Sequence, residues 1–169
     1  MKSTKNHQEL YIKEVFRLER ISVCRDIEFE AAHMLEGYDG GCGSLHGHSY
    51  KISIVISCPE QVRQNNDFGF VLDFKELNKI LKDNVPDHMF MCNKNNGENT
   101  VEGQIVKILR QNNLRVWEFN KTPSAENMVK ELAQNFQQVI DNLYPEKDIR
   151  VEKLRLWETT NSHSIWERG

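Results

Sequence analysis

Two stretches of alternating apolar and polar residues, joined by a glycine-rich segment, constrain the fold of this 169-residue chain more than any other feature. Every second residue from Ile27 to His33 is apolar or histidine, and the same holds for every second residue from His46 to Ile54. Successive strand residues point to opposite faces of a sheet, so each stretch predicts a strand with one buried face. Paired as an antiparallel hairpin, the strands bring His33, His46 and His48 together near the loop.

These three histidines form a candidate metal site. Zinc prefers nitrogen and sulfur donors, and a catalytic zinc usually keeps three protein ligands and one open position. A His-x-His pair alone is weak evidence, because such pairs are often structural or exposed. A third imidazole on the same buried face makes a metal the better explanation. We therefore expect His33, His46 and His48 to bind a divalent cation; zinc suits them best, although other divalent ions also accept three histidines.

Cys42 lies in the segment between the two strands, next to Gly41 and Gly43. Glycines favour a mobile loop over a rigid clamp, so we expect the thiol to stay free for chemistry. The alternative is that Cys42 is the fourth ligand of a closed structural site. The first interpretation makes the chain an enzyme, and the second makes it a zinc-stabilised module.

Composition narrows the class of protein. One domain is the natural expectation at 169 residues, and we place it over residues 21–169, after a polar arm over residues 1–20. A net charge of −3 argues against general nucleic-acid binding, which usually requires a basic face. The sequence has no apolar run of membrane-spanning length and no signal-peptide pattern at its start. The four cysteines show no disulfide framework, so we expect reduced thiols in the cytoplasm.

The remaining chain predicts helices and then two more strands. We expect, in order, a loop over 60–67, a helix from the cap Asp73 to Pro86, a helix over 100–111, a strand over 115–119, a helix over 122–145, and strands over 149–158 and 162–166. This order predicts an α+β fold with helices on one face of an antiparallel sheet. A small sheet of this kind could hide its edges by assembling into a ring.

Five motifs occur in an order that resembles a known family: Phe29-Glu30-Ala31-Ala32-His33, Cys42-x-x-x-His46-Gly47-His48, Asp87-His88, Pro123-Ser124-Ala125-Glu126-Asn127 and Trp157-Glu158-Thr159-Thr160. Over residues 21–166 the chain resembles the 6-pyruvoyltetrahydropterin synthase superfamily. Within it, the gap between the cysteine and His-Gly-His is similar to that of the bacterial 6-carboxytetrahydropterin synthases of queuosine biosynthesis. The resemblance implies the tunnelling fold, β-β-α-α-β-β, whose subunits form oligomeric barrels, typically homohexamers built as a dimer of trimers, with active sites between subunits.

The resemblance also implies a reaction and a set of roles. The family reaction converts 7,8-dihydroneopterin triphosphate, a small pterin, to 6-carboxy-5,6,7,8-tetrahydropterin and releases acetaldehyde and triphosphate. By motif match, the zinc ligands are His33, His46 and His48, the proton-transferring residues are Cys42, Asp87 and His88, and the pterin-anchoring residue is Glu158. The same match makes Thr159, Ser124 and Glu126 further substrate-contacting positions.

Simpler explanations exist for several of these residues. Asp87-His88 alone is explained as a turn after Pro86, and Glu158 alone as a solvated strand residue. Ser124 and Glu126 are explained as helix-capping residues. The segment 93–119 is longer than in compact members of the family. Two other functions stay open: a related enzyme that forms 6-pyruvoyltetrahydropterin or cleaves the pterin side chain, and a zinc-stabilised module that binds a purine or pterin without turnover.

Overall fold

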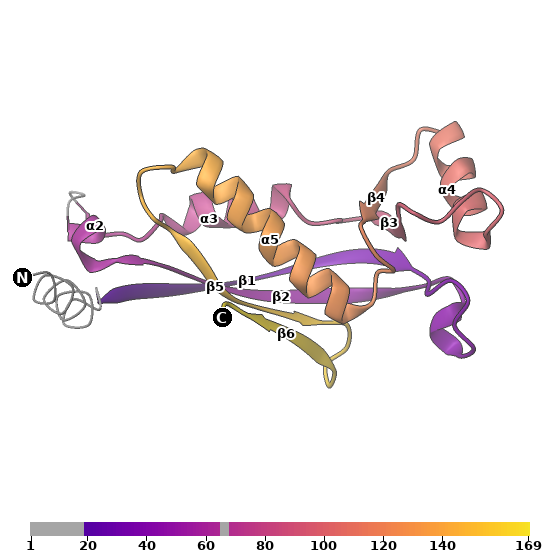
Figure 1. Ribbon diagram of the computed structural model, residues 1–169, viewed down its shortest axis with the longest axis horizontal. Coiled ribbons are helices and arrows are strands. Elements are labelled where there is room, and N and C mark those ends of the chain that lie inside the picture. The colour runs from indigo at the N-terminus through magenta and orange to yellow at the C-terminus, as the bar shows by residue number, and fades with distance from the viewer. Residues whose placement is uncertain (1–18, 65–67) are drawn as a thin grey trace, which may run out of the picture.

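A six-stranded sheet in the order β4-β3-β1-β2-β5-β6 forms the centre of the computed structural model, which describes residues 19–64 and 68–169 (Figure 1). The N-terminal arm expected over residues 1–20 lies outside the described residues, apart from Glu19 and Arg20. The α+β class and the order of the main strands agree with the prediction from the sequence.

The longest pairing joins β1 (Arg20–His33) and β2 (His46–Pro59), which run antiparallel from one end to the other. The predicted hairpin is therefore confirmed, and β2 begins at His46, where the alternating pattern begins. His33 lies directly opposite His46 in the register. Because the face alternates at every residue, His48 shares the side of the sheet on which His33 and His46 lie.

Helices α3 (Phe74–Asp83) and α5 (Ala125–Leu143) cover one face of the sheet (Figure 1). Both begin at capping residues: Asp73 accepts a hydrogen bond from the Lys75 N–H, and Ser124 accepts one from the Asn127 N–H. Their apolar stripes pack on the buried side chains of the strands. Each such side chain stabilises the fold by about 1.5–3 kcal/mol when fully buried. The fully buried members of the helices include Leu77, Leu81, Leu132, Phe136 and Ile140.

The antiparallel part of the sheet is completed by β5 (Arg150–Trp157) and β6 (His163–Glu167). Strand β5 pairs with β2, and β6 pairs with β5. Both strands lie within one residue of the bounds expected from the sequence at each end. Residue 158 follows directly after β5. Because Lys51 of β2 pairs with Trp157, residue 158 lies one step further along, opposite position 50.

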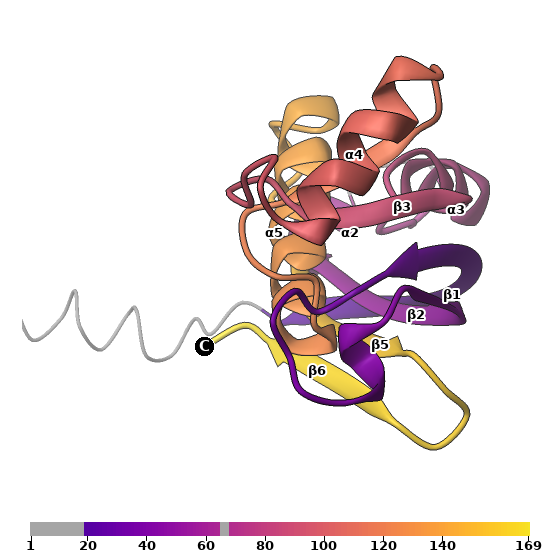
Figure 2. The ribbon, with the colours of Figure 1, turned by 90° about the vertical axis from the view of Figure 1, so that its right-hand side faces the viewer.

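A β3–α4–β4 segment extends the sheet on its other side, through β3 (Met89–Asn93), α4 (Val101–Gln111) and β4 (Val116–Phe119). Both added strands are parallel to their neighbours, so the sheet is mixed rather than wholly antiparallel. The segment lies at the same end of the molecule as the β1–β2 loop (Figures 1 and 2). The helix and β4 were predicted, whereas β3 was not.

Helix α4 packs on the opposite face of β3 from α5. Met91 points into the main core, whereas Phe90 and Cys92 point into a second apolar cluster that includes Ile105 and Leu109 of α4. The expectation that all helices lie on one face is therefore wrong for α4. A strand buried on both faces is apolar at every position, and this is why Met89 to Cys92 shows no strand-like alternation.

Two smaller elements complete the fold. The loop expected over residues 60–67 is wrong in its first part, because α2 spans Glu60–Gln64 and carries an ion pair between Glu60 and Arg63. A 3₁₀ turn, Gly41–Gly43, interrupts the β1–β2 loop. Over residues 19–64 and 68–169, no helix combines the length and the apolar character needed to cross a membrane.

Candidate active site

The three histidines of the hairpin form a compact cluster. The ring centroids of His33 and His46 are 4.5 Å apart, those of His46 and His48 4.9 Å, and those of His33 and His48 5.3 Å. One nitrogen from each ring lies within 4.8 Å of the other two. Neighbouring imidazoles with this spacing can converge on one divalent ion, and neutral imidazole is a common zinc ligand.

Hydrogen bonds set the tautomer of two of these rings. The Nδ1 atom of His33 lies 2.8 Å from the carbonyl oxygen of Pro123, and the Nδ1 atom of His46 lies 2.8 Å from that of Ser44. A carbonyl oxygen can only accept, so both Nδ1 atoms carry the proton and both Nε2 atoms keep a lone pair. Metal-binding histidines use this arrangement, in which one ring nitrogen donates to a carbonyl and the other binds the ion.

The environment of His33 also fits a metal ligand. Only 2% of the residue is exposed, and its Nε2 atom has no hydrogen-bond partner within the described part of the chain. A buried polar atom without a partner destabilises the fold, and a coordinated ion would satisfy it. Burial lowers the pKa of His33 to about 4 and also lowers that of His48. Both rings are therefore neutral at pH 7, which is the form that binds metal.

One carboxylate, that of Glu158, lies beside the cluster, and a second, that of Glu126, acts on the first. The Oε1 atom of Glu158 is 3.9 Å from the Nε2 atom of His33. Burial raises the pKa of Glu158, and the charge of Glu126 raises it further. The predicted substrate-contacting residues Glu158 and Glu126 are thus close enough to interact with each other, and Glu158 adjoins the histidine cluster.

Ser124 and Thr159 have clear local roles. Ser124 caps α5 through its hydroxyl oxygen. Thr159 Oγ1 accepts hydrogen bonds from the backbone N–H groups of Asn161 and Ser162, at 3.3 and 3.1 Å, in the turn between β5 and β6. For both residues the structure supports a structural role, and their expected contact with substrate stays a prediction.

Asp87 and His88 form an ordered pair at the start of β3. Asp87 Oδ1 accepts from the Glu30 N–H at 3.0 Å and from His88 Nδ1 at 2.9 Å. These hydrogen bonds, that from Glu30 most of all, lower the pKa of Asp87. The His88 N–H donates to the Glu30 carbonyl oxygen at 2.6 Å and holds the residue at a φ of 55°, which is uncommon outside glycine. His88 and His48 line one shallow hollow of about 470 Å³.

Cys42 is exposed on the 3₁₀ turn. It makes no hydrogen bond with Asp87 or His88 among the residues that the structure describes. Its charge does act on Tyr50, whose pKa is raised mainly by burial and further by Glu158 and Cys42. The described part of one subunit therefore places the thiol within electrostatic reach of Tyr50, with no hydrogen bond to the Asp87–His88 pair.

Tyr50 received no functional role in the sequence analysis. It is fully buried, and its ring stacks on Phe29 at 5.1 Å and meets the ring of His48 at 5.4 Å. Its hydroxyl has no hydrogen-bond partner in the described structure. The only sequence feature that could have drawn attention to Tyr50 was its position, because it is the next residue on the buried face that begins with His46 and His48.

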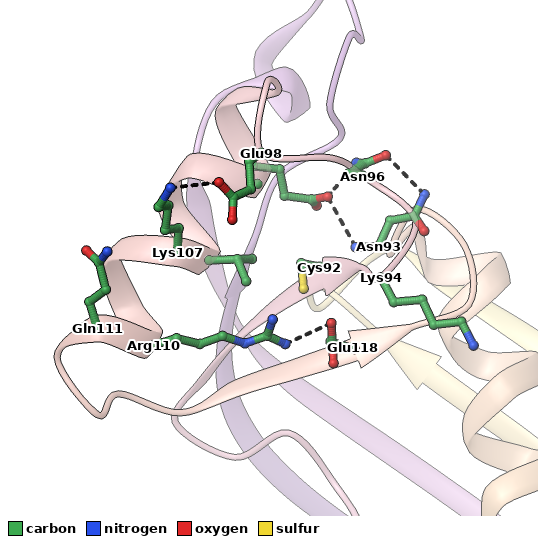
Figure 3. Close-up of a pocket in the computed structure, with 12 residues that line it drawn as sticks. Cys92, Asn93, Lys94, Asn96, Glu98, Lys107, Arg110, Gln111 and Glu118 are labelled. Atoms are coloured by element: carbon green, nitrogen blue, oxygen red, sulfur yellow. Dashed lines mark hydrogen bonds and ion pairs between the residues drawn. The ribbon is translucent and has the colours of Figure 1, made fainter.

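A second hollow, of about 360 Å³, lies between β3, α4 and β4 (Figure 3). Its charged side chains are largely paired with one another: Lys107 lies 2.7 Å from Glu98, and Arg110 lies 2.8 Å from Glu118. None of the residues predicted to act in catalysis or binding lines it. We therefore take the histidine cluster, and not this hollow, as the candidate active site.

Comparison with known proteins identifies the family of the chain. Residues 22–168 match the family described as 6-pyruvoyl tetrahydropterin synthase. The chain belongs to this family. Proteins named 6-carboxy-5,6,7,8-tetrahydropterin synthase are among its relatives. The one from Haemophilus influenzae is 28% identical over 143 residues, which are 83% of this chain and 94% of the relative. The one from Rickettsia bellii is 30% identical over 144 residues, or 83% and 96% of the two chains.

Solved structures show the same fold at lower identity. An uncharacterized protein from Wolinella succinogenes aligns with a TM-score of 0.65 at 18% identity, covering 89% of this chain and 99% of its own. The 6-pyruvoyl tetrahydropterin synthase of Plasmodium falciparum aligns with a TM-score of 0.61 at 19% identity, covering 88% and 98%. The predicted resemblance to the superfamily, its tunnelling fold and its enzymatic character are thereby confirmed.

Proposed function

We propose that this protein is a zinc-dependent lyase that converts 7,8-dihydroneopterin triphosphate to 6-carboxy-5,6,7,8-tetrahydropterin, with release of acetaldehyde and triphosphate, in queuosine biosynthesis in the cytoplasm. The observation that carries the proposal is the histidine cluster: backbone carbonyls set the tautomers of His33 and His46, and the buried Nε2 atom of His33 has no hydrogen-bond partner among the described residues. The names of the curated relatives support the choice of reaction.

His33, His46 and His48 would hold the zinc ion, which when bound supplies a Lewis acid that stabilises negative charge on a substrate oxygen. The chain itself prepares these ligands. Pro123 and Ser44 orient two of the rings through their carbonyl oxygens. Burial keeps His33 neutral, so that it does not have to lose a proton before it binds the metal.

Glu158 would bind the pterin. A carboxylate can accept two parallel hydrogen bonds from the amidine-like N–H edge of a pterin, and a ring without that edge would leave the carboxylate unpaired. Its position 3.9 Å from His33 would bring the pterin side chain next to the metal ligands. Glu126, whose charge acts on Glu158, and the nearby Ser124 and Thr159 complete the proposed binding region.

Cys42 and the Asp87–His88 pair would move the protons. Proton removal from carbon requires a base close to the reacting atom, and a thiol needs a neighbour that stabilises its anion. Asp87 accepts from Nδ1 of His88, which leaves the Nε2 atom of His88 free to exchange a proton. Since Cys42 makes no hydrogen bond to this pair among the described residues of one subunit, we propose that they meet across a subunit interface of a homohexamer.

Product analysis tests the proposal. Purified, zinc-loaded protein is incubated with 7,8-dihydroneopterin triphosphate, and acetaldehyde, triphosphate and the pterin product are quantified together. The proposal predicts acetaldehyde and triphosphate in equal amounts. Triphosphate without acetaldehyde would instead identify a 6-pyruvoyltetrahydropterin synthase. Binding of the substrate without release of either product would identify a module that recognises pterins without turnover.

A further inference from the structure

Two buried polar atoms of the candidate site lack a hydrogen-bond partner in the described structure: Nε2 of His33 and the hydroxyl oxygen of Tyr50. Buried polar groups in proteins are nearly always paired, so each exception requires an explanation. A metal ion would explain the His33 atom. It does not by itself explain the hydroxyl of Tyr50, which is also a hydrogen-bond donor.

Packing fixes where the Tyr50 ring lies. Tyr50 is paired with Phe29 across the hairpin, and the two rings are stacked 5.1 Å apart with an interplanar angle of 13°. The rings of His48 and His33 meet it edge-on, at 5.4 and 6.0 Å between centroids. Contacts on several sides leave the ring little freedom, so the hydroxyl points in a defined direction.

The proposed pterin anchor lies next to Tyr50. Strands β2 and β5 pair Lys51 with Trp157, and one step further along the same register brings position 50 opposite position 158. Consistent with this geometry, the charges of Glu158 and Cys42 both act on the Tyr50 hydroxyl. The hydroxyl therefore lies among groups proposed to bind the metal, hold the pterin ring and move a proton.

We infer that the Tyr50 hydroxyl donates a hydrogen bond to an oxygen atom of the bound substrate, on the part of the pterin side chain that lies against His33 and His48. The inference rests on the proposed function, because it takes a pterin with an oxygenated side chain as the ligand. It makes Tyr50 a catalytic residue in addition to those assigned by motif. A substrate oxygen would give this hydroxyl the partner that it lacks among the described residues.

The variant Tyr50→Phe tests this inference, since it removes the hydroxyl and keeps the ring. The metal-free variant should unfold at a temperature equal to or above that of the wild type, because a buried hydroxyl without a partner destabilises the fold. Zinc content per subunit should be unchanged. The kcat/KM for 7,8-dihydroneopterin triphosphate should fall by about tenfold to a hundredfold, as expected for one lost hydrogen bond.

Tyr144→Phe is the matched control. The hydroxyl of Tyr144 already donates to Glu76, at 3.3 Å, far along the chain from the candidate site. Its removal should leave kcat/KM unchanged and should not raise the unfolding temperature.

Two results would overturn the inference. A metal-free Tyr50→Phe protein that unfolds clearly below the wild type would show that the hydroxyl has a structural partner. An unchanged kcat/KM would show that it does not contact the substrate. Failure of the proposed function looks different, because the wild type itself then converts no substrate. In that case the inference falls together with the proposed function on which it rests, whatever the stability of Tyr50→Phe.

Discussion

The carbonyl oxygen of Pro123 accepts a hydrogen bond from His33, with 2.8 Å between it and the Nδ1 atom. Pro123 immediately precedes Ser124, the capping residue of α5, and His33 is the last residue of β1. The start of the longest helix therefore sets the tautomer of a proposed metal ligand. Outer contacts of this kind are typically worth about 10–100-fold in metal affinity. The motif around Pro123 thus contributes to the proposed metal site through its backbone, in addition to the contact with substrate that is proposed for it.

Removal of one imidazole should abolish metal binding. We expect His46→Ala to lower zinc affinity by more than about a hundredfold, since loss of a ligand should cost at least as much as loss of an outer contact. Zinc per subunit, measured by elemental analysis after gel filtration, checks this outcome. His163→Ala is the control, because His163 is exposed on β6 and its ring meets that of Trp157 at a tilt, outside the cluster. Equal zinc loss in both variants would contradict a specific role for His46.

Substitution of Cys42 should separate catalysis from metal binding. We expect Cys42→Ala to lower kcat by about 10²–10⁴-fold, the usual contribution of a proton-transferring group, while zinc content stays at the wild-type level. Cys24→Ala provides a matched control, because this thiol is also exposed and lies in the middle of β1. If Cys42→Ala loses its zinc along with its activity, Cys42 is a fourth ligand and the site is structural.

Glu102 should make stability depend on pH. Glu102 lies in the first turn of α4 and is fully buried. This burial raises the pKa of its carboxyl above the usual value. The folded state then binds its proton more tightly than the unfolded state does. The free energy of unfolding should therefore fall as pH rises from about 4.3, the pKa of a glutamate carboxyl in the unfolded chain, through the higher pKa of Glu102 in the folded protein.

The variant Glu102→Gln removes this titration. The free energy of unfolding of the wild type, relative to that of Glu102→Gln, should decrease from pH 4 to pH 7 in urea titrations. Glu98→Gln is the control, because Glu98 lines the same hollow but is largely exposed and paired with Lys107 (Figure 3). The control should not show this decrease. A stability difference between wild type and Glu102→Gln that does not vary with pH would refute the assignment.

Local patterns were sufficient for most of the fold. The alternation in Ile27–His33 and His46–Ile54 predicted the hairpin and the common face of the histidines. Successive side chains of a strand point to opposite faces, so a strand with one buried face is visible in the sequence as alternating apolar and polar residues. Strand β3 was missed for the opposite reason: it is apolar at nearly every position, since α4 covers one of its faces and the main core the other. The side of the sheet on which α4 packs is set by tertiary contacts, which no local pattern contains.

The candidate site, like the fold, has features that the local sequence predicts and features that only the folded structure reveals. The clustering of His33, His46 and His48 followed from spacing and face. The role of Pro123 could not be predicted, because it is carried by a backbone carbonyl, which every residue possesses. Tyr50 was visible only as another buried position, since its unpaired hydroxyl depends on the residues that pack around it. Cys42 and His88 make no hydrogen bond to each other in the described part of one subunit, and the meeting proposed for them depends on assembly.

The coordination of the ion is the most direct test of the account, and X-ray absorption spectroscopy of the zinc-loaded protein measures it. We predict a first shell of nitrogen and oxygen donors at about 2.0–2.1 Å, with the multiple-scattering pattern of imidazole rings. Cys42→Ala should give the same spectrum. A sulfur donor at about 2.3 Å that disappears in Cys42→Ala would contradict the central claim that three histidines bind the metal while the thiol stays free.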